Sequence, residues 1–433
     1  MFQLFLIAFR NLGTHRRRTL LLGGAIAGVT ALLVILMGLS TGMKDTMLRS
    51  ATTLSTGHVN VGGFYKVSAG QAAPIVTGYP KVIEQVRQAV PEVDYIVQRG
   101  RGWAKVVSEA GSMQLGVGGI DIQAEPGFRT VIQVRSGSMD GLAEPGSVLL
   151  FEKQAKRLEV KVGDTLTIVA PTMRGTSNTV DVRVAAIAAD VGMMSDFNVY
   201  VPSTTLRALY QLREDTTGAI MVYLKDVAQV PEVQARLRKS LADAGHEIMD
   251  NDPRAFFFKF EVVNREAWTG QKLDITNWED EISFISWTLA ALNGLTGILI
   301  FVLLAIICVG IMNTLWIAIR ERTREIGTLR AIGMQRTRVM VMFIFEAMTL
   351  GALGTLAGAL VGMVVCLAIN TSGMAVPEVV AMFIMSDKLN LAVNPGAVVG
   401  AMVFITACTT GISLIPSFLA ARMKPVTAMH HIG

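Results

Sequence analysis

The residue types that carry most catalytic and metal chemistry are sparse in this chain. Its five histidines are scattered apart from one adjacent pair, His430 and His431, and no spacing of histidine or cysteine predicts a metal site. All three cysteines lie inside apolar runs: Cys308, Cys366 and Cys408. The sequence contains no Gly-Lys dipeptide, hence no phosphate-binding loop, and no Ser/His/Asp, Cys/His or paired-carboxylate pattern. The pattern therefore predicts no catalysis by this chain.

The most informative charged segment is arginine-rich and follows an apolar run directly, at residues 320–333. Read as a helix, it places Ile326, Leu329 and Ile332 on one face, with Gly333 beside them, and its arginines elsewhere. Such a short amphipathic helix suits a partner's groove, and the alternative is a membrane-surface helix anchored by arginines. The residues predicted to contact a partner are Glu321, Arg322, Arg324, Glu325, Ile326, Leu329, Arg330, Ile332 and Gly333.

The composition indicates a membrane protein with a large water-exposed domain. Of its 433 residues 51% are apolar, and the mean hydropathy is +0.47. Four runs approach or exceed the roughly 20 apolar residues that a spanning helix needs: 20–43, 295–319, 339–369 and 395–419. We therefore predict four transmembrane helices with an α+β extracytoplasmic domain, residues 44–262, inserted between the first and the second.

Basic residues predict the orientation of these helices. Arginine and lysine are concentrated in 1–19, in 320–338 and in 420–433, which are therefore expected on the cytoplasmic side. The loop 370–394 has a single lysine and is expected on the outer side. The first apolar run lacks a small-residue cleavage site and is expected to remain as an anchor in the inner membrane. The net charge of +5 then reflects topology, and we expect no nucleic-acid partner.

The inserted domain alternates strand-like and helical patterns. Helical patterns occur at 203–210 and at 230–244, the second with Pro231 in its first turn and Gly245 after its end. The run 255–260 holds three consecutive phenylalanines, which cannot all face one core if the segment is extended. They either meet lipid, substrate or a carrier, or form a buried junction strand. The strand-like runs are 93–98, 103–108, 113–117, 148–151, 165–169, 180–187, 198–201 and 219–224.

A second periodic pattern precedes the second apolar run, in residues 263–294. Apolar residues recur there at steps of three and four, which predicts a stalk helix running outward from the membrane. The alternative is an internal helix of the domain core. The residues of this seam are Trp268, Ile275, Trp278, Ile282, Ile285, Leu289 and Leu292.

The third apolar run carries a glycine ladder and one carboxylate. The four glycines share one helical face and predict close packing against another helix: Gly351, Gly354, Gly358 and Gly362. Glu346 near the start of this run is costly to bury. It is interpreted either as a functional residue or as an interfacial residue paired with a nearby arginine.

Three segments resemble the permease subunits of ABC transporters in the MacB/FtsX-like superfamily, including lipoprotein-releasing permeases of the LolC/LolE type. The stretch from Glu321 to Gly333, reading ERTREIGTLRAIG, is similar to the coupling-helix signature of that family. Glu346 with the glycine ladder resembles its third span, and IPSFLAARMKPV at 415–426 resembles its C-terminal ending. Within the inserted domain the resemblance is weaker, although RLEVKVGDTL at 157–166 is similar to a recurring stretch of the family's domain.

This resemblance implies a permease that pairs with a second copy or a similar chain. Its coupling helices would sit on a dimer of ABC ATP-binding subunits, which would bind ATP and Mg²⁺, while this chain binds no cofactor. A periplasmic carrier or adaptor and membrane lipids are further expected partners. Two such permeases would enclose a lateral apolar substrate cavity lined by Met43, Met47, Trp278, Ile282, Ile285 and Leu289.

The leading functional hypothesis is ATP-driven extraction or export of a membrane-associated substrate such as a lipoprotein. One alternative is an FtsX-like mechanotransmission protein, which regulates an outer-side hydrolase or sensor without transport. Another is a MacB-like drug or peptide efflux permease. In all three, ATP hydrolysis is expected on a separate subunit, so this chain is not itself expected to be an enzyme.

Overall fold

The chain forms two compact units in the computed structural model. The membrane unit comprises Met1–Asp45, Leu289–Ala375 and Lys388–Gly433, and the outer unit comprises Thr46–Thr288 and Val376–Asp387. Helices α2 (Arg16–Leu54) and α11 (Ser283–Glu321) contribute residues to both. The residues that the structure describes are 10, 13–14, 16–68, 71–173, 175–321, 323–386 and 388–422.

The four predicted apolar helices are confirmed, and the inserted domain lies between the first and second of them. The segments long and apolar enough to span a membrane are Thr19–Leu54, Trp287–Asn313, Arg336–Ser372 and Pro395–Ala421. They lie in α2, α11, α13 (Arg336–Ser372) and α15 (Pro395–Ala421). Helices α2 and α11 each have 39 residues. At about 1.5 Å per residue each is nearly twice as long as a hydrocarbon core of about 30 Å is thick.

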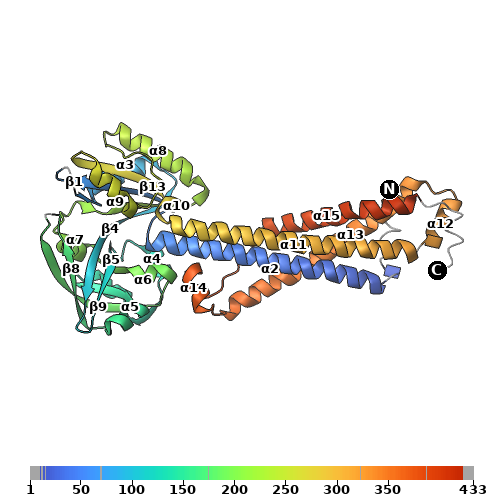
Figure 1. Ribbon diagram of the computed structural model, residues 1–433, viewed down its shortest axis with the longest axis horizontal. Helices are drawn as coiled ribbons and strands as arrows, with labels where there is room; N and C mark the ends of the chain where they lie inside the picture. The colour runs from blue at the N-terminus through green and yellow to red at the C-terminus, as the bar shows by residue number, and fades with distance from the viewer. Residues whose placement is uncertain are drawn as a thin grey trace. The chain divides into compact units, whose positions relative to one another are not determined.

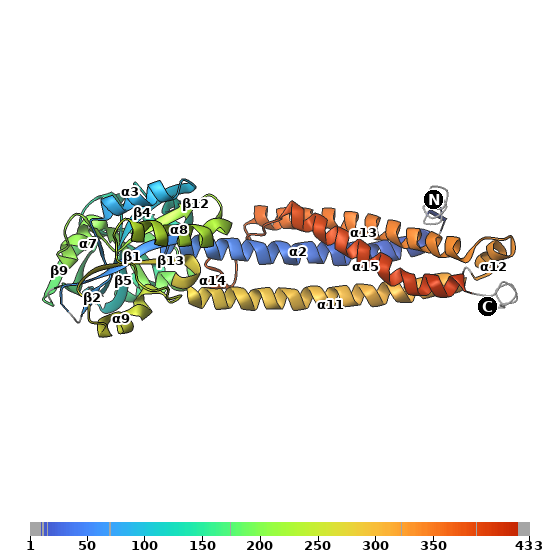
Figure 2. The same ribbon diagram turned by 90° about the horizontal axis from the view of Figure 1, so that it is seen from above.

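Within the membrane unit, α13 packs along α15 and against α2 (Figures 1 and 2). A Cβ atom built on Gly354 would lie 2.9 Å from Ile26, and one on Gly362 would lie 2.9 Å from Val34. At Gly358 it would collide with the backbone of Ala27. Gly351 faces α15 instead. Close backbone packing of this kind holds helices together in lipid, where apolar side chains gain little by leaving the solvent.

The outer unit is built on a mixed sheet with strand order β13-β1-β12-β4-β5-β10-β7-β9-β6. Its strands are β1 (Val59–Lys66), β2 (Ala72–Ala73), β3 (Val76–Thr77), β4 (Val93–Val107), β5 (Ser112–Ile120), β6 (Val134–Gly137), β7 (Ser147–Phe151), β8 (Thr165–Pro171), β9 (Ser177–Ala188), β10 (Asn198–Pro202), β11 (Thr216–Thr217), β12 (Ala219–Leu224) and β13 (Gly270–Asn277). Its helices are α3 (Tyr79–Ala89), α4 (Pro126–Val131), α5 (Glu152–Leu158), α6 (Gly192–Phe197), α7 (Ser203–Tyr210), α8 (Val230–Asp243), α9 (Phe256–Arg265), α10 (Trp278–Glu281) and α14 (Glu378–Ile384).

This sheet has two halves with separate cores, and the long strand β4 belongs to both. Residues 93–99 of β4 pair with β12, in the half that α3 and α8 cover. Residues 100–107 pair with β5, in the half that carries α5 and α7. The strand is therefore the structural link between the two halves (Figure 1).

The sequence pattern predicts two strands where the structure has the single strand β4. The two predicted runs, 93–98 and 103–108, leave out Arg99-Gly100-Arg101-Gly102. In the structure the two glycines of this stretch allow close packing on α7: a Cβ at Gly100 would lie 2.7 Å from Leu206, and one at Gly102 would meet the ring of Tyr210. The expected helices at 203–210 and 230–244 are found as α7 and α8.

The predicted stalk helix over residues 263–294 is wrong in its first part. Residues Gly270–Asn277 form β13, which pairs with β1 along its whole length. Leu273 and Ile275 enter the core of the first half, as alternate residues of a strand do. The helix starts only after a capping box at Asn277, and α11 begins at Ser283. The apolar spacing was misleading because its first members lie in or beside strand β13 and in the short helix α10, rather than in one continuous helix.

The triple-phenylalanine run is a helix rather than the extended segment considered from the sequence. In α9, Phe256 is half-buried, whereas Phe257 and Phe258 are 49% and 56% exposed. The hypothesis of a buried junction strand is therefore wrong. Lys259, one residue on, is fully buried.

The loop between α13 and α15 contains α14, which packs against α6 of the outer unit. A segment that connects the third and fourth spans therefore touches the domain inserted between the first and second. Four spanning helices put these two segments on the same side of a membrane, so this contact supports the predicted number of spans.

Gly358 provides a test of the packing in the membrane unit. Gly358→Leu should destabilise the protein by about 1–3 kcal/mol, because the new side chain meets backbone atoms of α2 that cannot rotate away. Gly411→Leu is the matched control, since nothing lies within 4 Å of a Cβ at that position of α15. Thermal unfolding of the full-length protein in detergent measures both. Equal stability of the two variants would contradict the close contact.

Candidate functional site

Helix α2 ends inside the outer unit, where side chains donate hydrogen bonds to its buried last carbonyls. The hydroxyl of Tyr223 donates to the carbonyl oxygen of Thr52 at 3.0 Å. Arg99 Nη1 donates to Thr53 at 2.8 Å and to Leu54 at 3.0 Å, and the Tyr200 hydroxyl donates to Leu54 at 2.7 Å. Carbonyls in the last turn of a helix lack partners within the helix. We call Arg99, Tyr200 and Tyr223 the helix-end socket.

Arg99 is the centre of the socket. Its side chain is 3% exposed and forms a two-pronged ion pair with Glu125, with Nε donating to Oε1 at 3.2 Å. The planar guanidinium can thus bind a carboxylate and two carbonyls at once, which a lysine cannot do. Its positive charge also interacts favourably with the C-terminal end of the helix dipole.

The charges and protons of the socket are fixed by burial. Burial raises the pKa of Glu125, and the adjacent Arg99 opposes that shift. Burial likewise raises the pKa of Tyr200 and of Tyr223, so that both hydroxyls remain protonated donors at any physiological pH. The socket is therefore a permanent set of donors facing the end of α2.

A second group of charges surrounds the start of α10, the turn that leads into α11. Lys259 Nζ lies 2.7 Å and 2.9 Å from the two carboxylate oxygens of Asp274. Glu281 accepts a hydrogen bond from Thr276 Oγ1 at 2.7 Å and lies 3.9 Å from Arg101 Nη1. Burial raises the pKa of Asp274, which Lys259 opposes, and lowers the pKa of Arg101.

The two groups meet on strand β4. Arg99 and Arg101 are two residues apart and so lie on the same face of the strand. Arg99 binds the end of α2, and Arg101 faces Glu281, the last residue of α10, two residues before α11 begins. Together the groups form a buried charge cluster of three cations and three carboxylates: Arg99, Arg101, Lys259, Glu125, Asp274 and Glu281.

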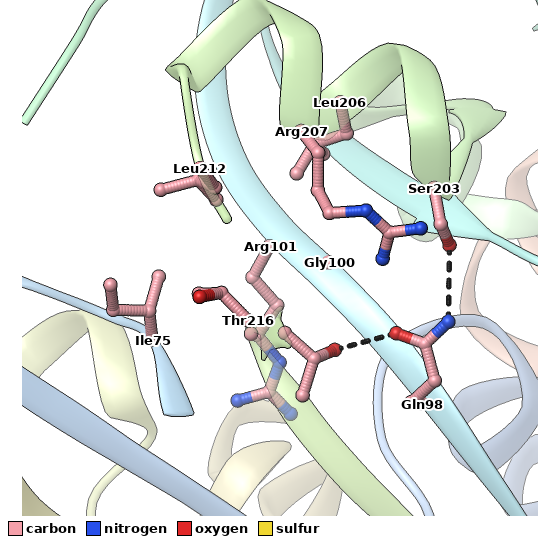
Figure 3. Close-up of a pocket in the computed structure, with 11 residues that line it drawn as sticks. Ile75, Gln98, Gly100, Arg101, Ser203, Leu206, Arg207, Leu212 and Thr216 are labelled. Atoms are coloured by element: carbon pink, nitrogen blue, oxygen red, sulfur yellow. Dashed lines mark hydrogen bonds between the residues drawn. The ribbon is translucent and has the colours of Figure 1, made fainter. Parts of the chain in front are cut away.

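A small pocket lies where the two halves of the sheet meet (Figure 3). Gln98 joins them, because it donates to Ser203 at 3.5 Å and accepts from Thr217 at 2.9 Å. Arg101 and Arg207 also line the pocket. It has room for about one water molecule, which is too little for a transported substrate.

The predicted partner-binding segment contains a short helix, α12 (Thr323–Ala331). Ile332 is 81% exposed, and Gly333, with φ of +103°, ends the helix. Glu321 is exposed at the end of α11, and Arg330 Nη1 donates to Met334 at 3.3 Å. Arg322 lies outside the described residues. Only the backbone position on α12 is described for Arg324, Glu325, Ile326 and Leu329.

The six predicted cavity residues are divided between the units. Met43 and Leu289 are half-buried in the membrane unit. Met47 and Ile282 are buried in the outer unit, and Trp278 packs against the core of the first half of the sheet. Trp278 is therefore a core residue rather than part of a stalk surface. The side chain of Ile285 is not among those described.

Glu346 of α13 is buried among the membrane helices, with 4% of the residue exposed. Sequence reasoning missed the socket and the charge cluster entirely. The only signal for them was the pair Arg99 and Arg101 inside a strand-like pattern. Charged residues on a strand that is otherwise buried usually have buried partners.

Comparison with known proteins gives two family matches that cover most of the chain. The model of the MacB-like periplasmic core domain matches residues 19–240, more than half of the chain. The model of the FtsX-like permease C-terminal region matches residues 297–425.

Individual relatives cover the chain to different extents. The macrolide export ATP-binding/permease protein MacB of Chlorobaculum tepidum is 25% identical over 98% of this chain and 60% of its own length. The pyoverdine export ATP-binding/permease protein PvdT of Pseudomonas syringae is 30% identical over 48% of this chain and 26% of its own length. The chain thus spans at most about 60% of these relatives.

Among solved structures, the match to the periplasmic region of MacB from Actinobacillus actinomycetemcomitans covers 54% of the present chain and 95% of the MacB chain. The sequence identity is 13% and the TM-score is 0.30. At that TM-score the similarity adds nothing to the two family matches.

Arg99→Met should be strongly destabilising. The substitution leaves Glu125 buried without its cation and removes the two hydrogen bonds from Arg99 to the carbonyls of Thr53 and Leu54, for an expected loss of about 3–5 kcal/mol. The measurement is denaturant unfolding of the full-length protein in detergent. Arg129→Met is the control: its pair with Asp140 is exposed and should contribute about 0–1 kcal/mol. An Arg99 variant no less stable than the Arg129 variant would rule out the socket as a source of stability.

Lys259→Met should make stability depend on pH. Without Lys259, the pKa of buried Asp274 rises further above its value in the unfolded chain. Stability contributed by a group with a raised folded pKa is lost as pH rises through that pKa. The deficit relative to wild type should therefore be larger at about pH 7.5 than at about pH 5. In Lys259→Met combined with Asp274→Asn this difference should vanish, and a deficit equal at both pH values in the single variant would exclude an ionised Asp274.

Proposed function

This chain belongs to the ABC permeases that combine a MacB-like periplasmic core domain with an FtsX-like C-terminal region, and we propose that it drives export by transmitting movement mechanically. The family is membrane-embedded, with a periplasmic domain. In the proposal, ATP hydrolysis by a partner moves the membrane helices, and the outer unit converts that movement into displacement of a substrate.

The observation that carries the proposal is the fixed end of α2. One uninterrupted helix runs from Arg16 to Leu54. Along the membrane unit it packs against the glycine ladder of α13, and its last carbonyls are held by the helix-end socket. A helix that is held both at the glycine ladder and at the helix-end socket passes a displacement on along its axis, because a packed helix deforms less easily than a loop.

The input to this path is proposed to be the segment 320–333. It connects α11 to α13, so a partner bound there acts directly on the helix that carries the glycine ladder. We assign the partner as a dimer of ABC ATP-binding subunits, which would supply ATP and Mg²⁺. The relatives combine ATP-binding and permease functions by name, whereas this chain has no Gly-Lys dipeptide for a phosphate loop.

The output would act on a substrate held between two permease chains, with a periplasmic carrier or adaptor beyond them. MacB and PvdT are named for export of macrolides and pyoverdine. These names favour MacB-like efflux of amphiphilic molecules as the first candidate. Lipoprotein release is the second, supported by the LolC/LolE-like order of spans and domain. Stimulation of the reconstituted ATPase by a macrolide or by a lipoprotein distinguishes the two.

Loss of the socket hydroxyls should uncouple transport from ATP hydrolysis. In Tyr200→Phe combined with Tyr223→Phe, two hydrogen bonds to α2 disappear, at about 1 kcal/mol each, while Arg99 keeps the domain folded. We expect substrate release to fall severalfold while ATP hydrolysis by the bound partner persists. Tyr210→Phe is the matched control, because that hydroxyl bonds the carbonyl of Trp103 rather than α2.

A variant in the segment 320–333 should lose function in a different way. Leu329→Asp places a charge on the predicted apolar face of α12 and should remove the ATPase from the purified complex. Co-purification and transport at wild-type levels in that variant would refute the partner contact. Unchanged transport in the tyrosine double variant would refute transmission through α2.

A further inference from the structure

Helix α14, in the loop between α13 and α15, has two different apolar faces. The face toward the outer unit is well packed: Ile384 and Met385 are each 3% exposed. A Cβ at Gly192 of α6 would lie 2.5 Å from the carbonyl oxygen of Met382. Ser50, near the end of α2, donates to the carbonyl oxygen of Met385 at 3.2 Å. The inner face is thus a fixed part of the outer unit.

The other face of α14 has no partner among the described residues of the chain. Val379 is 72% exposed, Val380 41% and Phe383 48%. At about 100° per residue these three side chains lie within an arc of about 100° on the helix. We call these three residues the α14 face.

The chain holds the α14 face close to the end of one spanning helix, α13. Only residues 373–377 separate α13 from α14, so the end of α13 lies at most roughly 20 Å away along the chain. The flanking segments are themselves fixed to the membrane unit. Leu389 donates to the carbonyl oxygen of Met374 at 3.0 Å, and Ala392 donates to that of Gly38, also at 3.0 Å.

The chemistry of the face selects one kind of occupant. It offers two valines and one phenylalanine but no hydrogen-bonding group, and α14 contains a single charged residue, Glu378, with no lysine or arginine. Apolar residues such as phenylalanine on one face of a short helix are typical of segments that lie at the boundary between acyl chains and headgroups. A protein partner would usually require polar groups around such a patch.

We propose that α14 is an interfacial helix whose exposed face inserts among phospholipid acyl chains at the outer surface of the membrane. This inference goes beyond the proposed export function and does not depend on it. Because the helix has no basic residue, binding needs no anionic lipid and is insensitive to salt. Its inner face is packed on α6 and hydrogen-bonded to α2, so the lipid surface becomes a support for the outer unit.

The experiment places a fluorescent probe on the face in the full-length protein. Val379→Cys, Val380→Cys and Phe383→Cys are each labelled with a thiol-reactive bimane after reconstitution into phosphatidylcholine nanodiscs. The signal of the labelled parent protein, which contains Cys308, Cys366 and Cys408, is subtracted. Emission is then compared with two quenchers: a phospholipid with a nitroxide near the headgroup end of its acyl chain, and aqueous iodide.

Insertion predicts that the nitroxide lipid removes about half of the emission at Val379 and Phe383, since interfacial helices reach about 5–10 Å below the headgroups. Iodide should have little effect there. Phe258→Cys is the matched control, because Phe258 is equally exposed on the same unit but far from any span in sequence. It should be quenched by iodide and not by the lipid.

Three results would overturn the proposal. Quenching of the α14 positions by iodide alone means that the face is in water. Protection from both quenchers means that protein covers it, from a second copy or a bound substrate. Lipid quenching of Phe258 to the same extent means that contact with lipid is not specific to α14. Agreement among the three labelled positions guards against misfolding of any one variant.

Discussion

The architecture depends on how the carbonyl end of α2 is satisfied away from the membrane. A helix that leaves the bilayer and stops inside a folded domain has its last carbonyls buried with no water to bond them, a cost of about 1–3 kcal/mol for each. Arg99, Tyr200 and Tyr223 supply those missing donors. They come from three different strands, β4, β10 and β12. The sheet must therefore assemble around the helix end, and the helix end in turn orders the junction of its two halves.

The charge cluster extends this dependence to the second membrane helix. A buried ion pair is seldom more stabilising than an apolar contact of the same size, whereas losing one member is costly. The three cations and three carboxylates in this buried region therefore favour one particular packing of the outer unit more than they add to its stability. Arg99 and Arg101 connect the end of α2 to the end of α10 through a single strand. A domain built this way resists small distortions at the two places where membrane helices reach it.

The sequence predicted the features that depend on local periodicity and composition. The four apolar helices, the inserted domain, α7 and α8 follow from runs and caps that a single segment contains. Two strands were missed: β1 is buried along almost its whole length on both faces, and the alternation of Leu273 and Ile275 in β13 was overlooked because Ile275 also fits the three- and four-residue steps of the predicted stalk helix. The spacing of Trp278 and Ile282 matched a heptad only by chance, because the seam runs across a strand and a turn. The socket was beyond reach because Arg99 is separated from Tyr200 and Tyr223 by more than 100 residues, and only folding brings the three side chains to the end of α2.

The continuity of α2 has a consequence for helical phase and for evolution. Within the outer unit, Ser50 of α2 bonds the carbonyl of Met385, and the socket bonds the carbonyls of Thr52, Thr53 and Leu54 within the next turn. Inserting one residue between Ser50 and Thr52 would turn the helix end by about 100° relative to Ser50 and advance it by about 1.5 Å. The three carbonyls would then miss their donors while Ser50 kept its own bond. This stretch can therefore change length only by steps close to whole turns, such as seven residues at a time, which shift the phase by only about 20°.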